Sequence, residues 1–204
     1  MPKSILLALA THNKGKLREY ELLFKGSLIE LRGLSFFQKE VMYTEQGNSF
    51  KEIAIHKARY AARILGIPAL ADDSGLEVEA LHGGPGIFSA RYAGEPTNDH
   101  LNNRKLLEEM KDNVNRNAAF VCCLALSKPT GEHRVYTGKC TGVILREPVG
   151  TYGFGYDPCF YYPPLAKTFA ELTAEKKSKV SHRGQAMKKL KNDLNKVLMW
   201  LQQE

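Results

Sequence analysis

Residues 5–16 have the sequence ILLALATHNKGK, in which a short apolar run is followed directly by a polar turn. A continuous apolar run such as residues 5–10 is typical of a buried strand. Apolar side chains then recur at roughly helical spacing from Leu17 to Phe24, and Gly26 marks the end of that periodicity. This stretch therefore predicts a strand, a turn and a helix in succession.

A second helix and a second strand follow. Ser49 and Glu52 have the spacing of a capping box, alanines recur along one face of the segment after them, and Gly66 is expected to end the helix. Residues 69–71 form a short predicted strand, which Asp72-Asp73-Ser74-Gly75 is expected to break.

The rest of the chain continues to mix helices and strands. We expect an ordered loop over 82–94, a helix over about 98–111, strands over 118–126, 134–136 and 141–145 with a turn at 129–131, and a glycine- and aromatic-rich loop over 150–164. One long last helix has its apolar stripe at Met187, Leu190, Leu194, Val197, Leu198 and Leu201. We predict an α/β fold with a mixed sheet flanked by helices, in a single domain over residues 1–204.

The composition is that of an ordinary folded protein. Hydrophobic residues make up 43% and charged residues 25% of the 204 positions, which excludes a disordered or collagen-like chain. The 29 lysines and arginines exceed the 22 acidic residues, so the formal net charge is +7. That charge favours an anionic partner, whether nucleic acid, nucleotide or acidic lipid, without choosing among them.

The four cysteines, Cys122, Cys123, Cys140 and Cys159, have no C-x-x-C spacing of a zinc or redox site. Cys122 and Cys123 lie in an apolar run, which predicts core thiols suited to a reducing compartment. The first apolar run is shorter than the ~7–15 residues of a secretory signal core, and no run approaches the ~20 residues of a membrane-spanning helix. We therefore expect a cytoplasmic protein with no membrane partner.

The turn Thr11-His12-Asn13-Lys14-Gly15-Lys16 is a candidate anion-binding segment. Backbone N–H groups at a helix start, flanked by lysines, favour a phosphate. The spacing is that of neither a Walker A loop nor a dinucleotide fingerprint. An ordinary polar turn with solvated lysines is the alternative.

The pair Asp72-Asp73 at the end of a predicted strand is the second candidate. Carboxylates suit a Mg²⁺ ion shared with phosphate oxygens, and a carboxylate beside a metal-bound water can act as its general base. The alternative is an Asx-type turn in which both aspartates cap backbone groups.

Two further segments suit the base of a nucleotide. In Gly153-Phe154-Gly155-Tyr156-Asp157-Pro158, glycines alternate with aromatics, so that a ring can lie against a flat ligand; a tight aromatic turn on the core is the alternative. Ser181 is a candidate N-cap that places His182 and Arg183 in a first helical turn, where cations oppose the helix dipole. Either side chain can donate to a purine carbonyl, and a solvated basic turn is again the alternative.

Taken together, these segments resemble one family. Residues 11–16, DDSGL at 72–76, GGPGIFSARYAG at 83–94, FGYD at 154–157 and SHR at 181–183 are similar, in order, to motifs of the inosine triphosphate pyrophosphatase family, the non-canonical purine nucleoside triphosphate pyrophosphatases. The resemblance runs from about residue 5 to residue 190.

The resemblance implies an elongated fold with a long central mixed sheet and two lobes around a nucleotide cleft. It also implies a homodimer and a Mg²⁺-dependent reaction, with Mn²⁺ as the alternative metal, in which a nucleoside triphosphate and water give the monophosphate and pyrophosphate. The implied substrates are dITP, ITP and XTP, whose removal cleanses the nucleotide pool.

The resemblance also implies roles for individual residues. Thr11, His12, Asn13, Lys14, Gly15 and Lys16 would hold the triphosphate, and Ser74 would contact the substrate. Asp73 would accept the proton of the attacking water and would share the metal with Glu45. Phe154 would stack on the base beside Gly155, Tyr156 and Asp157, and Lys177, His182 and Arg183 would line the base and sugar end.

One position departs from the family pattern. Ile53 follows Phe50-Lys51-Glu52 where the family commonly has Asn, so metal affinity or rate can differ here. Two alternative functions remain: a related pyrophosphatase acting on modified pyrimidine or methylated nucleotides, and a basic nucleic-acid-binding protein. The second is disfavoured because no recognised nucleic-acid-binding motif is present and the lysines of the last helix lie opposite its apolar stripe.

Overall fold

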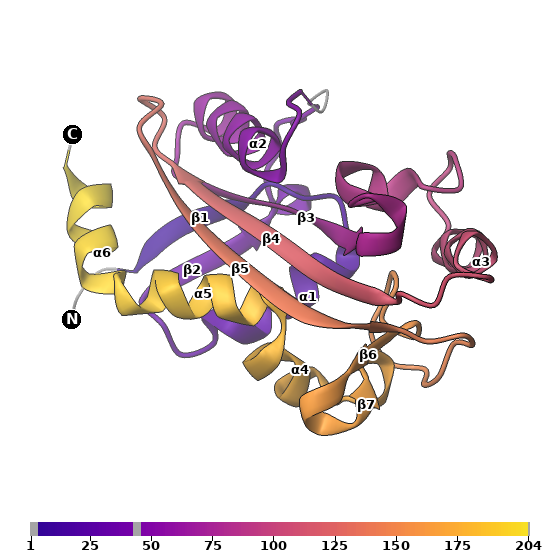
Figure 1. Ribbon diagram of the computed structural model, residues 1–204. Coiled ribbons are helices and arrows are strands. Elements are labelled where there is room, and N and C mark those ends of the chain that lie inside the picture. The colour runs from indigo at the N-terminus through magenta and orange to yellow at the C-terminus, as the bar shows by residue number, and fades with distance from the viewer. Residues whose placement is uncertain (1–3, 43–45, 204) are drawn as a thin grey trace. The chain divides into compact units, whose positions relative to one another are not determined.

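The computed structural model describes residues 4–42 and 46–203 (Figure 1). Its α-helices are α1 Lys14–Phe24, α2 Phe50–Leu65, α3 Asp99–Glu109, α4 Ala174–Val180, α5 His182–Asn192 and α6 Leu194–Gln202. Its strands are β1 Ile5–Leu9, β2 Ile29–Gly33, β3 Ala69–Val78, β4 Asn117–Ser127, β5 His133–Ile144, β6 Phe160–Tyr162 and β7 Lys167–Thr168. No helix in the described ranges is long and apolar enough to cross a membrane.

The strands form one mixed sheet in the order β2-β1-β3-β4-β5-β6-β7. β1 pairs in parallel with β2 and β3, whereas β6 pairs antiparallel with β5 and β7. The predicted α/β class with a mixed, helix-flanked sheet is therefore confirmed.

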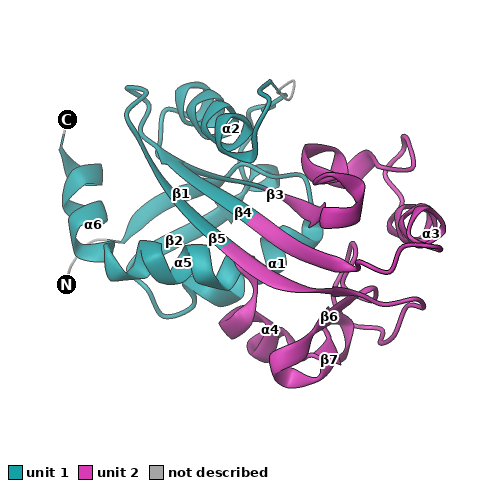
Figure 2. Cartoon of the chain, in the orientation of Figure 1, with its two compact units in different colours: residues 1–73, 122–138, 183–204 teal, residues 74–121, 139–182 magenta. Residues whose placement is uncertain are grey.

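The chain divides into two compact units, coloured separately in Figure 2. Unit 1 comprises Met1–Asp73, Cys122–Gly138 and Arg183–Glu204, and unit 2 comprises Ser74–Val121 and Lys139–His182. Each unit has its own apolar core: Leu7, Tyr20, Leu70 and Leu124 belong to that of unit 1. Leu76, Phe120, Phe160 and Phe169 belong to that of unit 2.

The caps and apolar faces follow the sequence closely. Ser49 accepts from the Glu52 N–H at the start of α2, and Gly66 ends this helix in the left-handed conformation at φ 71°. All four cysteines are buried without a disulfide, as expected for core thiols. The whole predicted apolar stripe of the last helix packs on the core of unit 1.

Three predicted boundaries are wrong. β3 runs unbroken through Asp72 and Asp73, because neighbouring residues of a strand face opposite sides and each carboxylate has its own cationic partner. β5 joins two predicted strands, since the exposed Thr137, Lys139 and Thr141 alternate with buried residues along one strand. The last helix is two helices, α5 and α6, which meet at Asp193. No strand was predicted at β2, β6 or β7 and no helix at α4, and β6 lies inside the predicted loop over 150–164.

Candidate active site

The predicted anion-binding turn becomes the start of α1 in unit 1. Asn13 is the N-cap: its Oδ1 accepts from the Lys16 N–H at 2.9 Å, and its own N–H donates to Thr11 Oγ1 at 3.1 Å. Lys14, Gly15 and Lys16 thus form the first helical turn, and His12 is exposed beside it. A helix start of this kind presents N–H groups and positive potential to an anion.

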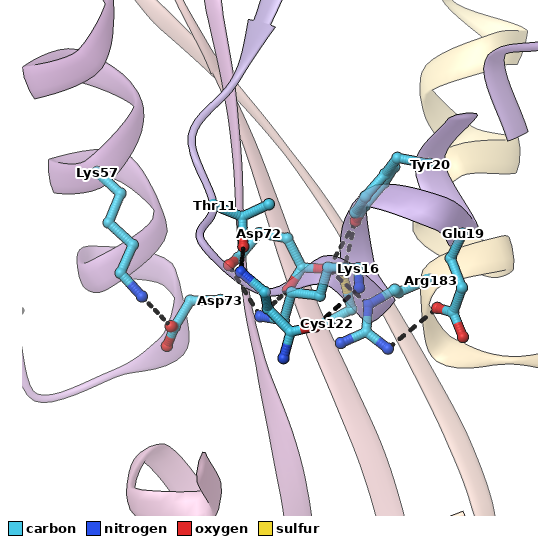
Figure 3. Close-up of polar contacts among 10 residues, drawn as sticks. Thr11, Lys16, Glu19, Tyr20, Lys57, Asp72, Asp73, Cys122 and Arg183 are labelled. Carbon is cyan, nitrogen blue, oxygen red and sulfur yellow. Dashed lines mark hydrogen bonds and ion pairs between the residues drawn. The ribbon is translucent and has the colours of Figure 1, made fainter. Parts of the chain in front are cut away.

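Asp72 is the centre of a buried polar cluster in unit 1 (Figure 3). Its Oδ1 accepts from Lys16 Nζ at 2.8 Å, and its Oδ2 accepts from Tyr20 Oη at 2.7 Å and Arg183 Nε at 2.8 Å. The Cys122 thiol lies 3.7 Å from the same Oδ2, and the Asp72 side chain is 0% exposed. Both carboxylate oxygens of Asp72 therefore accept hydrogen bonds within this cluster.

Two pKa shifts reflect this cluster. Burial, followed by the charge of Asp72, raises the pKa of Tyr20 well above its usual value, so Tyr20 stays a hydrogen-bond donor. Burial alone lowers the pKa of Arg183, but the carboxylates of Asp72 and Glu19 raise it above its usual value. Arg183 Nη1 donates to Glu19 Oε2 at 3.2 Å, so this guanidinium spans two acids.

Asp73 has a different environment. In Figure 3 it points toward Lys57 of α2, whose Nζ donates to Asp73 Oδ1 at 2.8 Å. Oδ2 has no hydrogen-bond partner within residues 4–42 and 46–203, and the side chain keeps 10% exposure. Burial raises the pKa of Asp73, and Lys57 and Lys16 oppose that rise. A carboxylate with one uncommitted oxygen and a raised pKa has the properties of a general base.

Lys57, which pairs with Asp73, was not predicted from the sequence. It lies on the face of α2 that carries the buried alanines Ala54, Ala58, Ala61 and Ala62, and it is itself buried. A lysine at a core-facing helical position is rare unless it is paired. A lysine on this alanine face is therefore the sequence feature that indicates a buried, paired Lys57.

The donor set fits a hard divalent cation. Within the described ranges no three His, Cys, Asp or Glu side chains gather as a metal site. Mg²⁺, however, needs only one or two protein carboxylates when substrate phosphates supply the rest, and the carboxylate of the predicted ligand Asp73 is of the type that suits it. Glu45, the other predicted ligand, lies outside the described residues.

The predicted base-binding segment lies in unit 2. Lys177 Nζ donates to Asp157 Oδ2 at 2.5 Å and lies 4.9 Å from the centre of the Phe154 ring. The same Oδ2 accepts from the Phe154 N–H at 3.0 Å, and Tyr156 Oη donates to the Ser89 carbonyl at 2.8 Å. The structure thus gathers Phe154, Asp157 and Lys177 into one assembly.

The remaining predicted residues divide between the units. Ser74 follows Asp73 along β3 and belongs to unit 2. His182 also belongs to unit 2, where its buried ring stacks on Phe120 with centroids 4.7 Å apart and planes at 13°. Its neighbour Arg183 belongs to unit 1 and contacts Asp72. His182 and Arg183 begin α5, as predicted.

Gly153→Ala is expected to disrupt the base-binding segment. Gly153 has φ +80°, and a Cβ there would lie 2.0 Å from Asp157 Oδ2, so the carboxylate that holds Phe154 and Lys177 must move. We expect a melting temperature several degrees lower, measured by calorimetry. Gly131→Ala is the control, because it has φ +95° but nothing within 4 Å of its Cβ. Equal losses in both variants would show that only backbone strain matters.

Comparisons with known proteins agree with the motifs. The model of the Ham1 family matches residues 7–193. A dITP/XTP pyrophosphatase of Desulfotalea psychrophila is 46% identical over 97% of this chain and 89% of its own length. Another of Syntrophobacter fumaroxidans is 48% identical over 96% of this chain and 84% of its own. A HAM1 protein structure from Coxiella burnetii has a TM-score of 0.85 and 41% identity, covering 94% of this chain and 99% of that one. The chain belongs to the Ham1 family.

Proposed function

We propose that this protein is a pyrophosphohydrolase of non-canonical purine nucleoside triphosphates, dITP, ITP and XTP, and that it removes them from the nucleotide pool. The observation that carries the proposal is the similarity, over more than nine tenths of the chain, to relatives named dITP/XTP pyrophosphatases. The Asp73–Lys57 pair supplies the chemistry that such a reaction needs.

The reaction is hydrolysis at the α-phosphorus. Asp73 Oδ2 takes a proton from water, whose oxygen bonds to the α-phosphorus while the bond to the bridging oxygen breaks, giving the monophosphate and pyrophosphate. The first turn of α1, with Thr11, Asn13, Lys14 and Lys16, holds the triphosphate and offsets the charge on the departing pyrophosphate. Asp73 and Glu45 would hold a Mg²⁺ ion, or Mn²⁺ in its place, which would offset charge on the phosphate oxygens.

Base selection is assigned to the other predicted residues. Phe154 stacks on the purine, beside Gly155, Tyr156 and Asp157, and Ser74 contacts the substrate. A donor from Lys177, His182 or Arg183 pairs with the oxygen at purine position 6, where adenine has an amino group. With an adenine nucleotide, the amino group and the protein donor face each other and neither is paired. Sites built on such a hydrogen bond discriminate strongly against the mismatched substrate. Nε and Nη1 of Arg183 already donate to Asp72 and Glu19, so this residue also secures the Asp72 cluster.

The substrate test uses the purified protein with Mg²⁺ and, in parallel, dITP, XTP, dGTP, dATP and dUTP. We expect pyrophosphate from dITP and XTP and little from the others. Orthophosphate without pyrophosphate would exclude attack at the α-phosphorus. Equal turnover of dATP and dITP would exclude the base-selection argument, and preference for dUTP would favour a pyrimidine substrate.

Lys57→Met is expected to move the acid limb of the pH profile to higher pH. Lys57 lowers the pKa of Asp73 against the effect of burial, so its removal lets that pKa rise further. Because the base must be ionised, kcat/KM then falls off at a higher pH than in the wild type. The control is Lys51→Met, an exposed lysine of the same helix. An unmoved acid limb in Lys57→Met would contradict Asp73 as the base.

We further propose a homodimer that acts in the cytoplasm without nucleic acid as partner. Four buried thiols without a disulfide suit a reducing compartment. Light scattering during size exclusion tests the dimer, and an RNA and DNA mobility-shift assay tests the second part.

A further inference from the structure

Two side chains of α3, outside every motif discussed above, hold the peptide groups of Gly155. The Gly155 N–H donates to Asp99 Oδ2 at 2.7 Å. The Gly155 carbonyl accepts from Asn103 Nδ2 at 2.9 Å, and the same Nδ2 donates to the Asp99 carbonyl at 2.9 Å. Asp99 and Asn103 are one helical turn apart, so together they hold both polar groups of one residue.

That residue controls the backbone beside Phe154. Gly155 has φ +62° and Gly153 has φ +80°. Phe154 is therefore flanked in the chain by two glycines in the left-handed backbone conformation. Such a segment has more backbone freedom than one built of other residues. On the Gly153 side, Asp157 Oδ2 holds the Phe154 N–H. On the other side, α3 holds Gly155, so the direction of Phe154 depends on both attachments.

Packing alone does not explain an asparagine at position 103. The residue is 8% exposed, and its Oδ1 is buried with no hydrogen-bond partner in the described part of the chain. A buried acceptor left unsatisfied opposes folding, whereas a leucine of similar shape would not. What the amide adds at this position is therefore its two Nδ2 hydrogen bonds.

We propose that Asp99 and Asn103 are positioning residues for the purine base, which set the Phe154 ring for stacking by holding Gly155. This rests on the proposed function, in which Phe154 stacks on the base. The two residues act on the nucleoside end of the ligand alone. Base affinity, rather than the chemical step or the phosphate affinity, is what they control.

The test compares Asn103→Leu and Asp99→Ala with the wild type in the full-length protein. IMP and inorganic pyrophosphate are titrated separately as product inhibitors of dITP hydrolysis. We expect the inhibition constant of IMP and the KM for dITP to rise about three- to tenfold, because a Phe154 ring that is no longer held must be ordered when the base binds. The inhibition constant of pyrophosphate and kcat are expected to stay within twofold.

Three comparisons separate an effect on positioning from an effect on stability. Glu108→Ala changes an exposed acid of the same helix and is expected to leave all four constants unchanged. Asn103→Leu is expected to change the melting temperature by only a few degrees, because the loss of two Nδ2 hydrogen bonds is partly offset by the removal of the unpartnered Oδ1. In a Phe154→Ala background, Asn103→Leu is expected to change IMP inhibition by less than twofold, because the two residues act through one ring.

The proposal is overturned if IMP inhibition is unchanged in both variants, if pyrophosphate inhibition weakens in parallel, or if the Asn103→Leu effect persists without Phe154. Wild-type protein that releases no pyrophosphate from dITP would instead contradict the proposed function itself, and this inference with it. Normal wild-type turnover with unaffected variants would contradict this inference alone.

Discussion

Asp73→Asn is expected to reduce dITP turnover by about three orders of magnitude while leaving the fold intact. A positioned general base contributes roughly 10²–10⁴ in rate, and Asp73 is also the proposed metal ligand. Asparagine has nearly the same shape and its Oδ1 can still accept from Lys57 Nζ, which now lies 2.8 Å from Asp73 Oδ1. Burial disfavours the charged form of Asp73, so removal of that charge partly offsets the loss of the ion pair with Lys57, and we expect a folded variant with a lower melting temperature.

The measurement is pyrophosphate release under saturating dITP, together with the melting temperature. Glu77→Gln, a half-buried acid of the same strand that pairs with Lys139 at 3.3 Å, is the matched control and is expected to keep full activity. Near-normal turnover by Asp73→Asn would show that another group is the base.

Asp72→Leu is expected to lower the free energy of unfolding by about 3–5 kcal/mol, the usual cost of removing one partner from a buried ion pair. The side chain is 0% exposed and receives hydrogen bonds from Lys16, Tyr20 and Arg183. Without it, Lys16 and the buried Arg183 lose the carboxylate that offsets their charge. The effect is therefore on stability first and on activity through it.

Urea denaturation measures the free energy of unfolding, and two variants with smaller expected losses serve for comparison. Tyr20→Phe removes one hydrogen bond to Asp72 Oδ2 and is expected to cost about 1 kcal/mol. Glu30→Gln breaks an exposed pair with Arg32 at 2.7 Å and is expected to cost about 0–1 kcal/mol. If Asp72→Leu costs no more than Glu30→Gln, the Asp72 cluster is not a stabilising element.

Much of the local structure was predictable because its determinants are short-range. The capping of α2 by Ser49, its end at Gly66 and the apolar stripe of the last helices depend on spacings of one to four residues. The boundaries that failed depend on distant partners. β3 continues through Asp72 and Asp73 because Lys16, Arg183 and Lys57 compensate their charges, and those residues lie 16 to 111 positions away.

The residues of the candidate site also divide into those that short motifs predict and those that depend on distant contacts. Motifs and family resemblance pointed to Asp73, to the turn at Thr11–Lys16 and to Phe154, Asp157 and Lys177. They did not distinguish the two adjacent aspartates by geometry, and they did not find Lys57, Tyr20 or Asn103. Each of these depends on which face of a helix or strand meets which neighbour.

By itself, the sequence determined the α/β class, the helix that follows the first strand, and the residue types of a nucleotide site, since these depend on periodicity, capping and motif composition. The tertiary structure alone decided that Asp72 is a buried charge with both oxygens in hydrogen bonds, that Asp73 has an oxygen outside any hydrogen bond within the described residues, and that α3 holds Gly155. The physical reason is that strand alternation and long-range ion pairs assign different surroundings to side chains that are neighbours in the chain.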